Sequence, residues 1–177
     1  MPEKVRSAAV SKASLYTSPT AQQFVISKWI EKNLDPKDGA IGFYYLGVSY
    51  HLPTFEIADF LGKADEVIAI SSVKWGPPGH NKWDTEKTLG KWSPQAIVPA
   101  GNADPYDDAA TEEARKLMQE RADFGFNFDL RLNQTVKRDY TYCYLPAYNP
   151  NDLHDKWGFF LKNNLALKYK SILKCNS

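Results

Sequence analysis

The sequence predicts an α+β domain in which helices near 19–34, 105–123 and 150–174 pack with an antiparallel sheet that includes a hairpin over 124–145. Two patterns predict this class. Apolar and polar residues alternate through most of 124–145, which is the period of a half-buried strand. In the three other ranges, apolar residues recur at intervals of three and four, which is the period of an amphipathic helix.

The composition is that of a single domain with balanced charge. The chain has 177 residues, a formal net charge of +1 and 43% hydrophobic residues, which is enough to bury a substantial core. The charge balance does not favour an anionic membrane surface as a partner. The sequence contains no apolar run of roughly 18 residues or more, the length that a spanning helix needs. No stretch near the start has the length of a signal peptide, so we expect one domain over 18–177, no membrane partner and a cytoplasmic location.

The first helix is predicted by its start and stop signals. Residues 1–17 are small, polar and basic, and they predict a flexible or partner-dependent arm. Ser18 and Pro19 then mark a helix start, because serine caps helices and proline fits the first turn without losing a hydrogen bond. Asp35-Pro36 ends this helix, because the residue before a proline disfavours the helical conformation.

The next part of the chain carries weaker signals. Residues 40–52 are aromatic and β-branched and predict a strand. Residues 55–61 predict a short helix, and 66–75 predict either a strand buried on both faces or a short helix. Residues 76–104 are rich in proline and glycine and predict a long irregular segment, with one capped turn at Asp84-Thr85 and another at Ser93-Pro94.

The helix over 105–123 is predicted most clearly. Its acidic residues, among them Asp107 and Glu112, lie in the first half, and its basic residues, among them Lys116 and Arg121, lie in the second. This order complements the helix dipole.

Two registers are compatible with the predicted hairpin, because facing residues of an antiparallel pair share one face. Val136 pairs either with Leu132 or with Leu130. The first register places like charges opposite each other, including Asp129 and Asp139, so the second is favoured. Both place Val136, Tyr140 and the tyrosines that follow on the buried face.

The C-terminal region, 150–174, predicts a helix whose apolar stripe includes Trp157, Phe160 and Leu161. Asn163-Asn164 falls inside this stripe, so the pattern fits one helix or two.

Cys143 and Cys175 are the only cysteines. Two cysteines do not form a disulfide framework, and in a reducing compartment we expect both to be free thiols.

No stretch has the signature of a catalytic or cofactor site. The sequence contains no phosphate-binding loop, no GxSxG and no GxGxxG. None of the three histidines has a second histidine or cysteine at the spacing of a metal site. We therefore expect no cofactor, no metal and no catalytic residue, and whether the chain is an enzyme stays open.

This lack of chemistry, together with the arm and the tryptophan-bearing segment, favours a non-enzymatic structural or interaction protein. The expected function is self-association, as in a coat-like or filament-like subunit, so the expected partner is a second copy. We expect the interface to include Trp83, Trp92, Leu15 and Tyr16, because exposed aromatic residues commonly anchor interfaces.

The first alternative is a small-molecule enzyme with an aromatic pocket. Its candidate pocket residues are Tyr50, His51, Tyr140 and Tyr142. The second alternative is a module that binds single-stranded nucleic acid by stacking bases on aromatic side chains. Its candidate contacts are Arg131, Lys137 and Arg138.

Overall fold

A computed structural model describes residues 19–44, 46–63, 65–70, 82–99, 129–145 and 158–176. The predicted arm over 1–17 and the predicted helix over 105–123 lie outside these residues. The described elements are, in chain order, α2 (Pro19–Asn33), η1 (Pro36–Asp38), β1 (Ile41–Phe43), η2 (Leu46–His51), β2 (Ile57–Asp59), α3 (Glu66–Ala69), α4 (Thr85–Trp92), β3 (Ala96–Val98), α7 (Gln134–Asp139), β4 (Tyr140–Tyr144), β5 (Phe159–Lys162), α8 (Asn163–Tyr169) and β6 (Lys174–Cys175).

The six strands form one mixed sheet in the order β2-β1-β3-β5-β4-β6. The α+β class is therefore confirmed. The prediction of an antiparallel sheet is confirmed only in part. β3, β5, β4 and β6 pair in antiparallel fashion, whereas β1 pairs in parallel with both β2 and β3.

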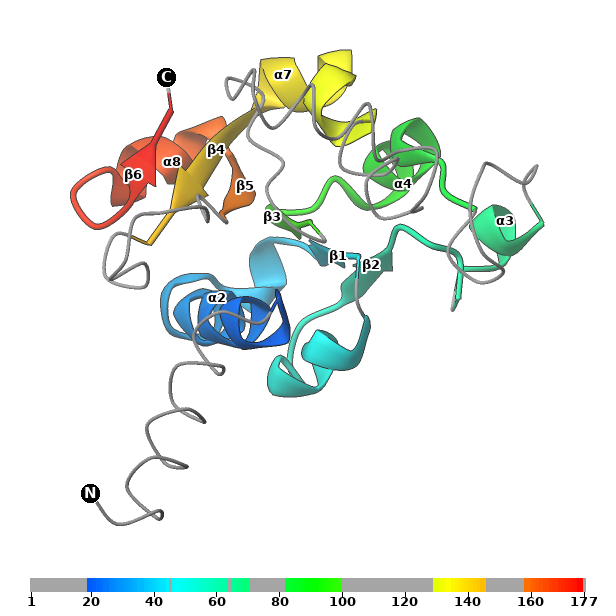
Figure 1. Ribbon diagram of the computed structural model, residues 1–177, viewed down its shortest axis with the longest axis horizontal. Coiled ribbons are helices and arrows are strands. Elements are labelled where there is room, and N and C mark those ends of the chain that lie inside the picture. Colours follow the sequence, from blue (N-terminus) through cyan, green and yellow to red (C-terminus); the bar gives the residue numbers. More distant parts are fainter. Residues whose placement is uncertain are drawn as a thin grey trace, which may run out of the picture.

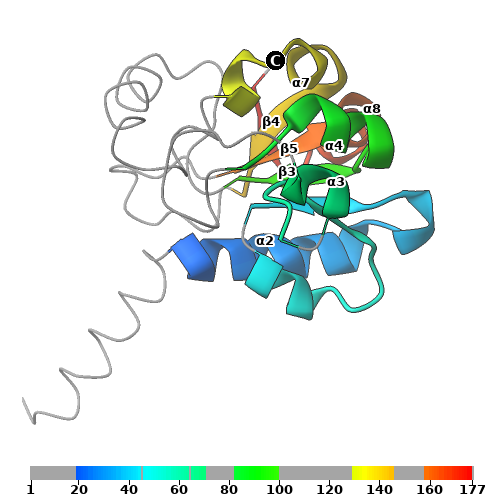
Figure 2. The ribbon, with the colours of Figure 1, turned by 90° about the vertical axis from the view of Figure 1, so that its right-hand side faces the viewer.

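Alternate residues of each strand enter two cores, one on each face of the sheet. On one face Ile97, Tyr142 and Phe160 pack with side chains of α4 and α7. On the other face Phe43 and Leu161 pack with side chains of α2 and α8. Figures 1 and 2 show α2 on one side of the sheet, with α4 and α7 on the other. The central strands are thus covered on both faces, which explains their nearly continuous apolar sequence.

α2 confirms the first predicted helix. Ile26, Trp29 and Ile30 form its buried stripe at the predicted helical spacing. Trp29 packs against Phe159 of β5 and Tyr169 of α8, with ring centroids 5.2 Å apart in both pairs. This helix therefore joins the N-terminal part of the described chain to its C-terminal part.

The structure differs from the prediction between residues 40 and 61. The predicted strand over 40–52 is confirmed only at β1, and a 3-10 helix, η2, follows it. The predicted helix over 55–61 is wrong, because 57–59 is strand β2 beside β1. A three-residue strand is too short to show a period of its own, so the apolar run did not distinguish the two structures.

Side-chain caps define the next two helices. Of the two alternatives for 66–75, the short helix is found at α3, where the Asp65 carboxylate accepts from the backbone N–H groups of Val67 and Ile68. The predicted cap at Asp84 is confirmed, and its carboxylate accepts from the Lys87 N–H at 3.1 Å. The helix that it begins, α4, has eight residues rather than one turn. The segment predicted to be irregular, 76–104, thus contains both α4 and β3 in its described part.

The predicted hairpin is confirmed only in its second strand, β4. Residues 124–128 lie outside the described part of the chain, and 129–132 are helical. The Asn133 N–H donates to the Asp129 carbonyl at 2.9 Å, and the Asn133 side chain caps α7. Val136 lies in α7, so neither predicted register forms. Consecutive residues Leu130 and Arg131 are both buried, which a strand with one wet face does not allow.

The predicted helix over 150–174 is also confirmed only in part. α8 begins at Asn163, where the pattern was interrupted, but 159–162 is strand β5. Phe159, Phe160 and Leu161 are all buried. Three consecutive buried residues fit a strand with both faces covered, and in sequence they resemble part of a helical stripe.

The expectation of free thiols is wrong, because Cys143 and Cys175 form a disulfide bond. The two residues face each other across β4 and β6. Beside them, the Asn176 N–H donates to the Tyr142 carbonyl at 3.0 Å. The two cysteines therefore form a non-hydrogen-bonded antiparallel pair, the kind in which the facing Cα atoms lie closer together. Sequence spacing alone, 32 residues, did not indicate this proximity.

Gly158 provides a test of the close contact between β5 and β4. A methyl group at this position would overlap the backbone carbonyl of Cys143. We expect Gly158→Ala to lower the free energy of unfolding by about 1–3 kcal/mol, the usual cost of overpacking, in a urea titration. Gly90→Ala is the matched control, because its methyl group would meet nothing within 4 Å inside α4. That change should stabilise the protein by about 0.4–1 kcal/mol, and an equal loss for both variants would contradict the packing argument.

Removing the disulfide tests how far it stabilises the fold. A loop of 32 residues predicts a stabilisation of roughly 3–4 kcal/mol through the restricted unfolded chain. We expect Cys175→Ser to lower the free energy of unfolding by about that amount under oxidising conditions. Wild-type protein with a reductant should match the variant, and a variant as stable as the oxidised wild type would contradict the expectation.

Candidate binding groove along the edge of β4

A groove of about 720 Å³ follows the edge of β4 between α7 and α8. We call it the β4 groove. It is lined by aliphatic and aromatic side chains, by two lysines and by a few uncharged polar residues. These lining residues are Val136, Lys137, Tyr140, Thr141, Tyr142, Phe160, Asn163, Ala166, Leu167, Lys170, Cys175 and Asn176.

The two helices flank the groove from opposite faces of the sheet. Val136 of α7 belongs to the core on one face, and Ala166 of α8 belongs to the core on the other. Asn163, Ala166, Leu167 and Lys170 are spaced at three and four residues, so a single side of α8 and its C-terminal end faces the groove. The groove therefore straddles the edge of the sheet.

Two β4 backbone groups at this edge have partners within the chain. The Tyr142 carbonyl accepts from the Asn176 N–H at 3.0 Å. The Tyr140 N–H caps α7 by donating to the Val136 carbonyl. Strand β6 covers only Cys143 and Tyr144 by pairing. These two groups are not open to a ligand, so the side chains that line the groove carry most of its recognition chemistry.

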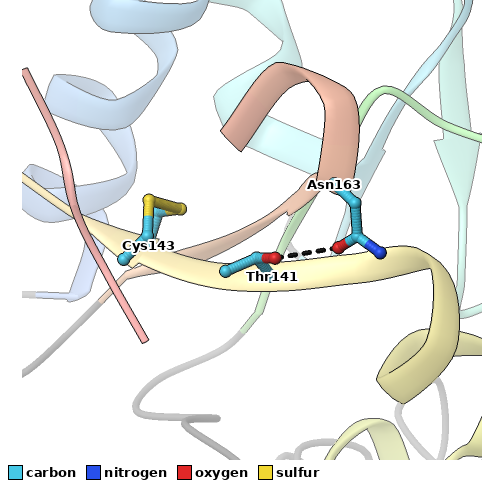
Figure 3. The surroundings of a disulfide bond; sticks show 4 residues. Thr141, Cys143 and Asn163 are labelled. Carbon is cyan, nitrogen blue, oxygen red and sulfur yellow. Dashed lines mark hydrogen bonds between the residues drawn. A yellow bond between two sulfur atoms is a disulfide. The ribbon is translucent and has the colours of Figure 1, made fainter. Parts of the chain in front are cut away.

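The disulfide holds one end of the groove in place. Cys175 and Asn176 line the groove, and the bond to Cys143 attaches them to β4. Thr141 donates its hydroxyl to the Asn163 side chain at 2.8 Å, which ties β4 to the first turn of α8 (Figure 3). The disulfide therefore attaches the Cys175–Asn176 wall of the groove to β4, and the Thr141–Asn163 hydrogen bond attaches the α8 wall.

The floor of the groove is aromatic, and its hydroxyl groups are already used. The Tyr140 hydroxyl donates to the Pro94 carbonyl at 2.8 Å, and the Tyr142 hydroxyl accepts from the Gly158 N–H at 2.7 Å. Tyr142 also packs edge-on against Phe160, with centroids 5.0 Å apart. Burial, with a smaller effect from the Asp139 charge, raises the pKa of Tyr140 well above its ordinary value. The floor is therefore made of nearly buried rings and offers no reactive phenol.

The charge on the groove is of one sign. Lys137 of α7 and Lys170 after α8 both line it, and no acidic residue from the described part of the chain does. Neither lysine forms an ion pair with any residue in the described parts of the chain. Leu167, which is 69% exposed, lies beside them on α8. The groove thus combines apolar surface with unpaired positive charge.

The predicted pocket residues fall at two separate places. Tyr140 and Tyr142 form the floor of the groove, whereas Tyr50 and His51 lie in η2, beside α2. Tyr50 is 86% exposed, and His51 packs edge-on against Phe24 with centroids 4.6 Å apart. The structure therefore does not bring the four residues into one pocket.

The predicted nucleic-acid contacts are also separated. Lys137 lines the groove, but Arg131 is buried and forms internal contacts. Arg138 bonds Asp139 through Nε and Nη2 at 2.8 and 2.7 Å. That bond raises the pKa of Arg138 and lowers the pKa of Asp139.

Of the predicted interface residues, Leu15 and Tyr16 lie outside the described part of the chain. Trp83 is buried in the core with α4, and Trp92 packs against the same cluster while half-buried. The Trp92 indole and the Lys91 ammonium both approach the Asp65 carboxylate, at 3.4 and 2.7 Å. Trp83 therefore presents little surface to a second molecule.

Sequence reasoning missed Leu167, Lys170 and Cys175 as groove residues. The spacing of Asn163, Leu167 and Lys170 on one side of a helix was the available signal. Within the described residues no group of three histidine, cysteine or acidic side chains could hold a metal ion, and no helix there is both long and apolar enough to cross a bilayer.

No family model, no curated protein and no solved structure matches this chain. Its function must therefore be inferred from its own side chains.

Tyr140→Phe tests the hydrogen bond beneath the groove. The change leaves the buried Pro94 carbonyl without its donor, so we expect a loss of about 1–3 kcal/mol in the free energy of unfolding near pH 7. An exposed control, Tyr50→Phe, should lower the free energy of unfolding much less, and equal losses would contradict the assignment.

The pH dependence of stability that Tyr140 contributes has a defined sign. The unfolded phenol ionises near 10.0 while the folded one stays neutral, so wild-type stability should fall above that pH and the variant's should fall less steeply.

Proposed function

We propose that this protein is a non-enzymatic interaction protein that associates with copies of itself. The observation that carries the proposal is an exposed aromatic surface formed by Phe24, Tyr50 and His51, which we call the α2–η2 surface. Phe24 is 40% exposed and Tyr50 is 86% exposed. The edge-on contact between Phe24 and His51 orders these rings before any partner arrives, which reduces the entropy lost on binding.

The neighbouring charges suit a second copy of the same chain. Phe24, Lys28 and Glu31 lie at intervals of four and three along the exposed side of α2. Lys28 pairs with Glu31 within one chain at 2.7 Å, and its ammonium also lies 5.9 Å from the Phe24 ring. In a two-fold contact each surface meets itself, so Lys28 of one copy can face Glu31 of the other.

This proposal moves the interface away from the tryptophans. Trp83 is buried in its own domain, so its expected role as an interface anchor loses support. The half-buried Trp92 contributes only a minor part of the proposed interface. The arm over 1–17 remains part of the proposal, because it joins α2 near the aromatic surface. Leu15 and Tyr16 are the residues of the arm that we expect to pack on a neighbouring copy.

The two alternatives receive less support from the geometry. The enzyme hypothesis required Tyr50, His51, Tyr140 and Tyr142 in one pocket, and they lie at two places. The nucleic-acid hypothesis required accessible arginines and stacking rings, but Arg131, Tyr140 and Tyr142 are buried, and the exposed Arg138 is paired with Asp139.

The disulfide changes the proposed location. Disulfides persist in oxidising compartments and are rare in the cytosol. In the Cys143–Cys175 disulfide, Cys143 is buried and Cys175 is half-buried. We propose that the protein works where this bond is maintained, and this proposal replaces the expected cytoplasmic location. Trapping free thiols with a maleimide in intact cells tests it, since an unlabelled protein supports the bond and a doubly labelled one contradicts it.

Light scattering coupled to size exclusion tests self-association. We expect the wild-type chain to exceed the monomer mass at micromolar concentrations. Phe24→Ser with Tyr50→Ser should raise the dissociation constant by about tenfold or more, because aromatic anchors at an interface are commonly worth over 1 kcal/mol each. Deleting 1–17 should act in the same direction.

The control is Ile70→Ser, which removes another strongly exposed apolar side chain from beyond the end of α3. This variant should keep the wild-type mass, and all variants should keep the wild-type circular dichroism. A wild-type chain that stays monomeric at high micromolar concentration and moderate salt would overturn the proposal.

A further inference from the structure

We infer that the β4 groove binds an amphipathic anion, a small molecule with an apolar body and a carboxylate or a similar head group. This site is separate from the α2–η2 surface and does not depend on self-association. It rests on the shape, the floor and the charge of the groove.

The shape favours a small molecule over a protein strand. A peptide that adds to a sheet edge binds through free backbone groups of that edge. Here the Tyr140 N–H and the Tyr142 carbonyl already have partners in Val136 and Asn176. The volume of about 720 Å³ lies within the range of small-molecule sites, roughly 300–1,000 Å³.

The floor favours an apolar body. The rings of Tyr140, Tyr142 and Phe160 close the bottom of the groove but are nearly buried, and both tyrosine hydroxyls are bonded elsewhere. Leu167, which is 69% exposed, supplies accessible aliphatic surface at the side of the groove. A hydrocarbon chain placed here would cover the exposed Leu167 and release water from apolar surface.

The charge favours an anionic head group. Lys137 and Lys170 approach from opposite faces of the sheet, and none of the lining residues in the described ranges is acidic. Each ammonium donates up to three hydrogen bonds from a flexible stem, so either lysine can follow a head group at the mouth of the groove. A cationic amphiphile of the same size would be repelled.

The disulfide contributes to the site by holding its end wall. Cys175 and Asn176 line the groove, but they lie at and just after the end of β6, which pairs with β4 at only two positions. Without the covalent bond, this wall would be retained by few interactions. Ligand affinity should therefore depend on the oxidised state of Cys143 and Cys175.

Isothermal titration calorimetry with three probes tests the inference on the full oxidised chain, below the concentrations at which the probes form micelles. The probes are decanoate, 1-decanol and decyltrimethylammonium. We expect decanoate to bind most tightly and decyltrimethylammonium most weakly. Lys137→Gln with Lys170→Gln should weaken decanoate binding about tenfold and leave 1-decanol binding unchanged. Leu167→Asp should weaken both, and Lys37→Gln with Lys63→Gln is the matched charge control.

Three results would overturn the inference. Decyltrimethylammonium binding as tightly as decanoate would indicate unselective apolar binding. Equal losses in the groove and control lysine variants would place the anion elsewhere. No heat with any probe would show that the groove is not a site for such ligands. The Phe24→Ser, Tyr50→Ser variant should bind decanoate normally, so a failure of self-association is distinguished from a failure of this site.

A separate measurement tests whether the disulfide, by holding the end wall, supports ligand binding. Cys175→Ser, or mild reduction of the wild type, should weaken decanoate and 1-decanol alike by several fold. Far-ultraviolet circular dichroism confirms that the chain is still folded under those conditions. Unchanged affinity in a folded, reduced protein would exclude the disulfide from any role in binding.

Discussion

The antiparallel pairing of β4 with β5 is the constraint on which the rest of the described structure depends. Four residue pairs, from Tyr140↔Lys162 to Cys143↔Phe159, join the two strands. Alternate residues of both strands enter the core on each face. Helix α7 runs directly into β4, and β5 runs directly into α8, so the pairing of the two strands sets the positions of both walls of the β4 groove. The absence of a side chain at Gly158 allows the close approach at one end of this pair.

The sequence predicted those elements whose signals were local. Ser18-Pro19 and Asp35-Pro36 delimited α2, and Asp84 correctly marked the start of α4. The alternation from Tyr140 onward identified β4. In each case the interactions that define the element lie within a few residues, so a reader of the sequence can find them.

Elements that depend on distant partners were not predictable in the same way. β5 is a strand because β3 and β4 lie beside it, and its apolar run fits a helix equally well. The alternation at Leu130 and Leu132 suggested a strand, but 129–132 forms a helical turn that the Asn133 N–H closes on the Asp129 carbonyl, and the Asn133 side chain then caps α7. The parallel pairing of β1 is likewise a property of the sheet rather than of any segment. For the site, Tyr140, Tyr142 and Lys137 were predicted individually, but only the fold shows that Lys170 and Leu167 join them.

The two exposed surfaces differ in the chemistry that they offer. The α2–η2 surface presents aromatic rings with charges of both signs beside them, which suits contact with an identical surface. The β4 groove presents apolar floor with charge of one sign, which suits a ligand of the opposite sign. Tyrosines occur at both places and serve opposite purposes. Tyr50 is almost fully exposed, whereas Tyr140 and Tyr142 use their hydroxyls to fix the core.

The disulfide has a mechanical consequence for the C-terminal end of the chain. β6 has only two residues. A strand this short forms few hydrogen bonds, so they do not prevent it from slipping by one position along its neighbour. The bond between Cys143 and Cys175 prevents this slip, because any other register would separate the sulfur atoms. A pulling force applied at the C-terminus would pass through this covalent link into β4, which pairs with β5 at four positions. The chain could then extend from that end only by breaking the pairing of β4 with β5, not by peeling away β6 alone.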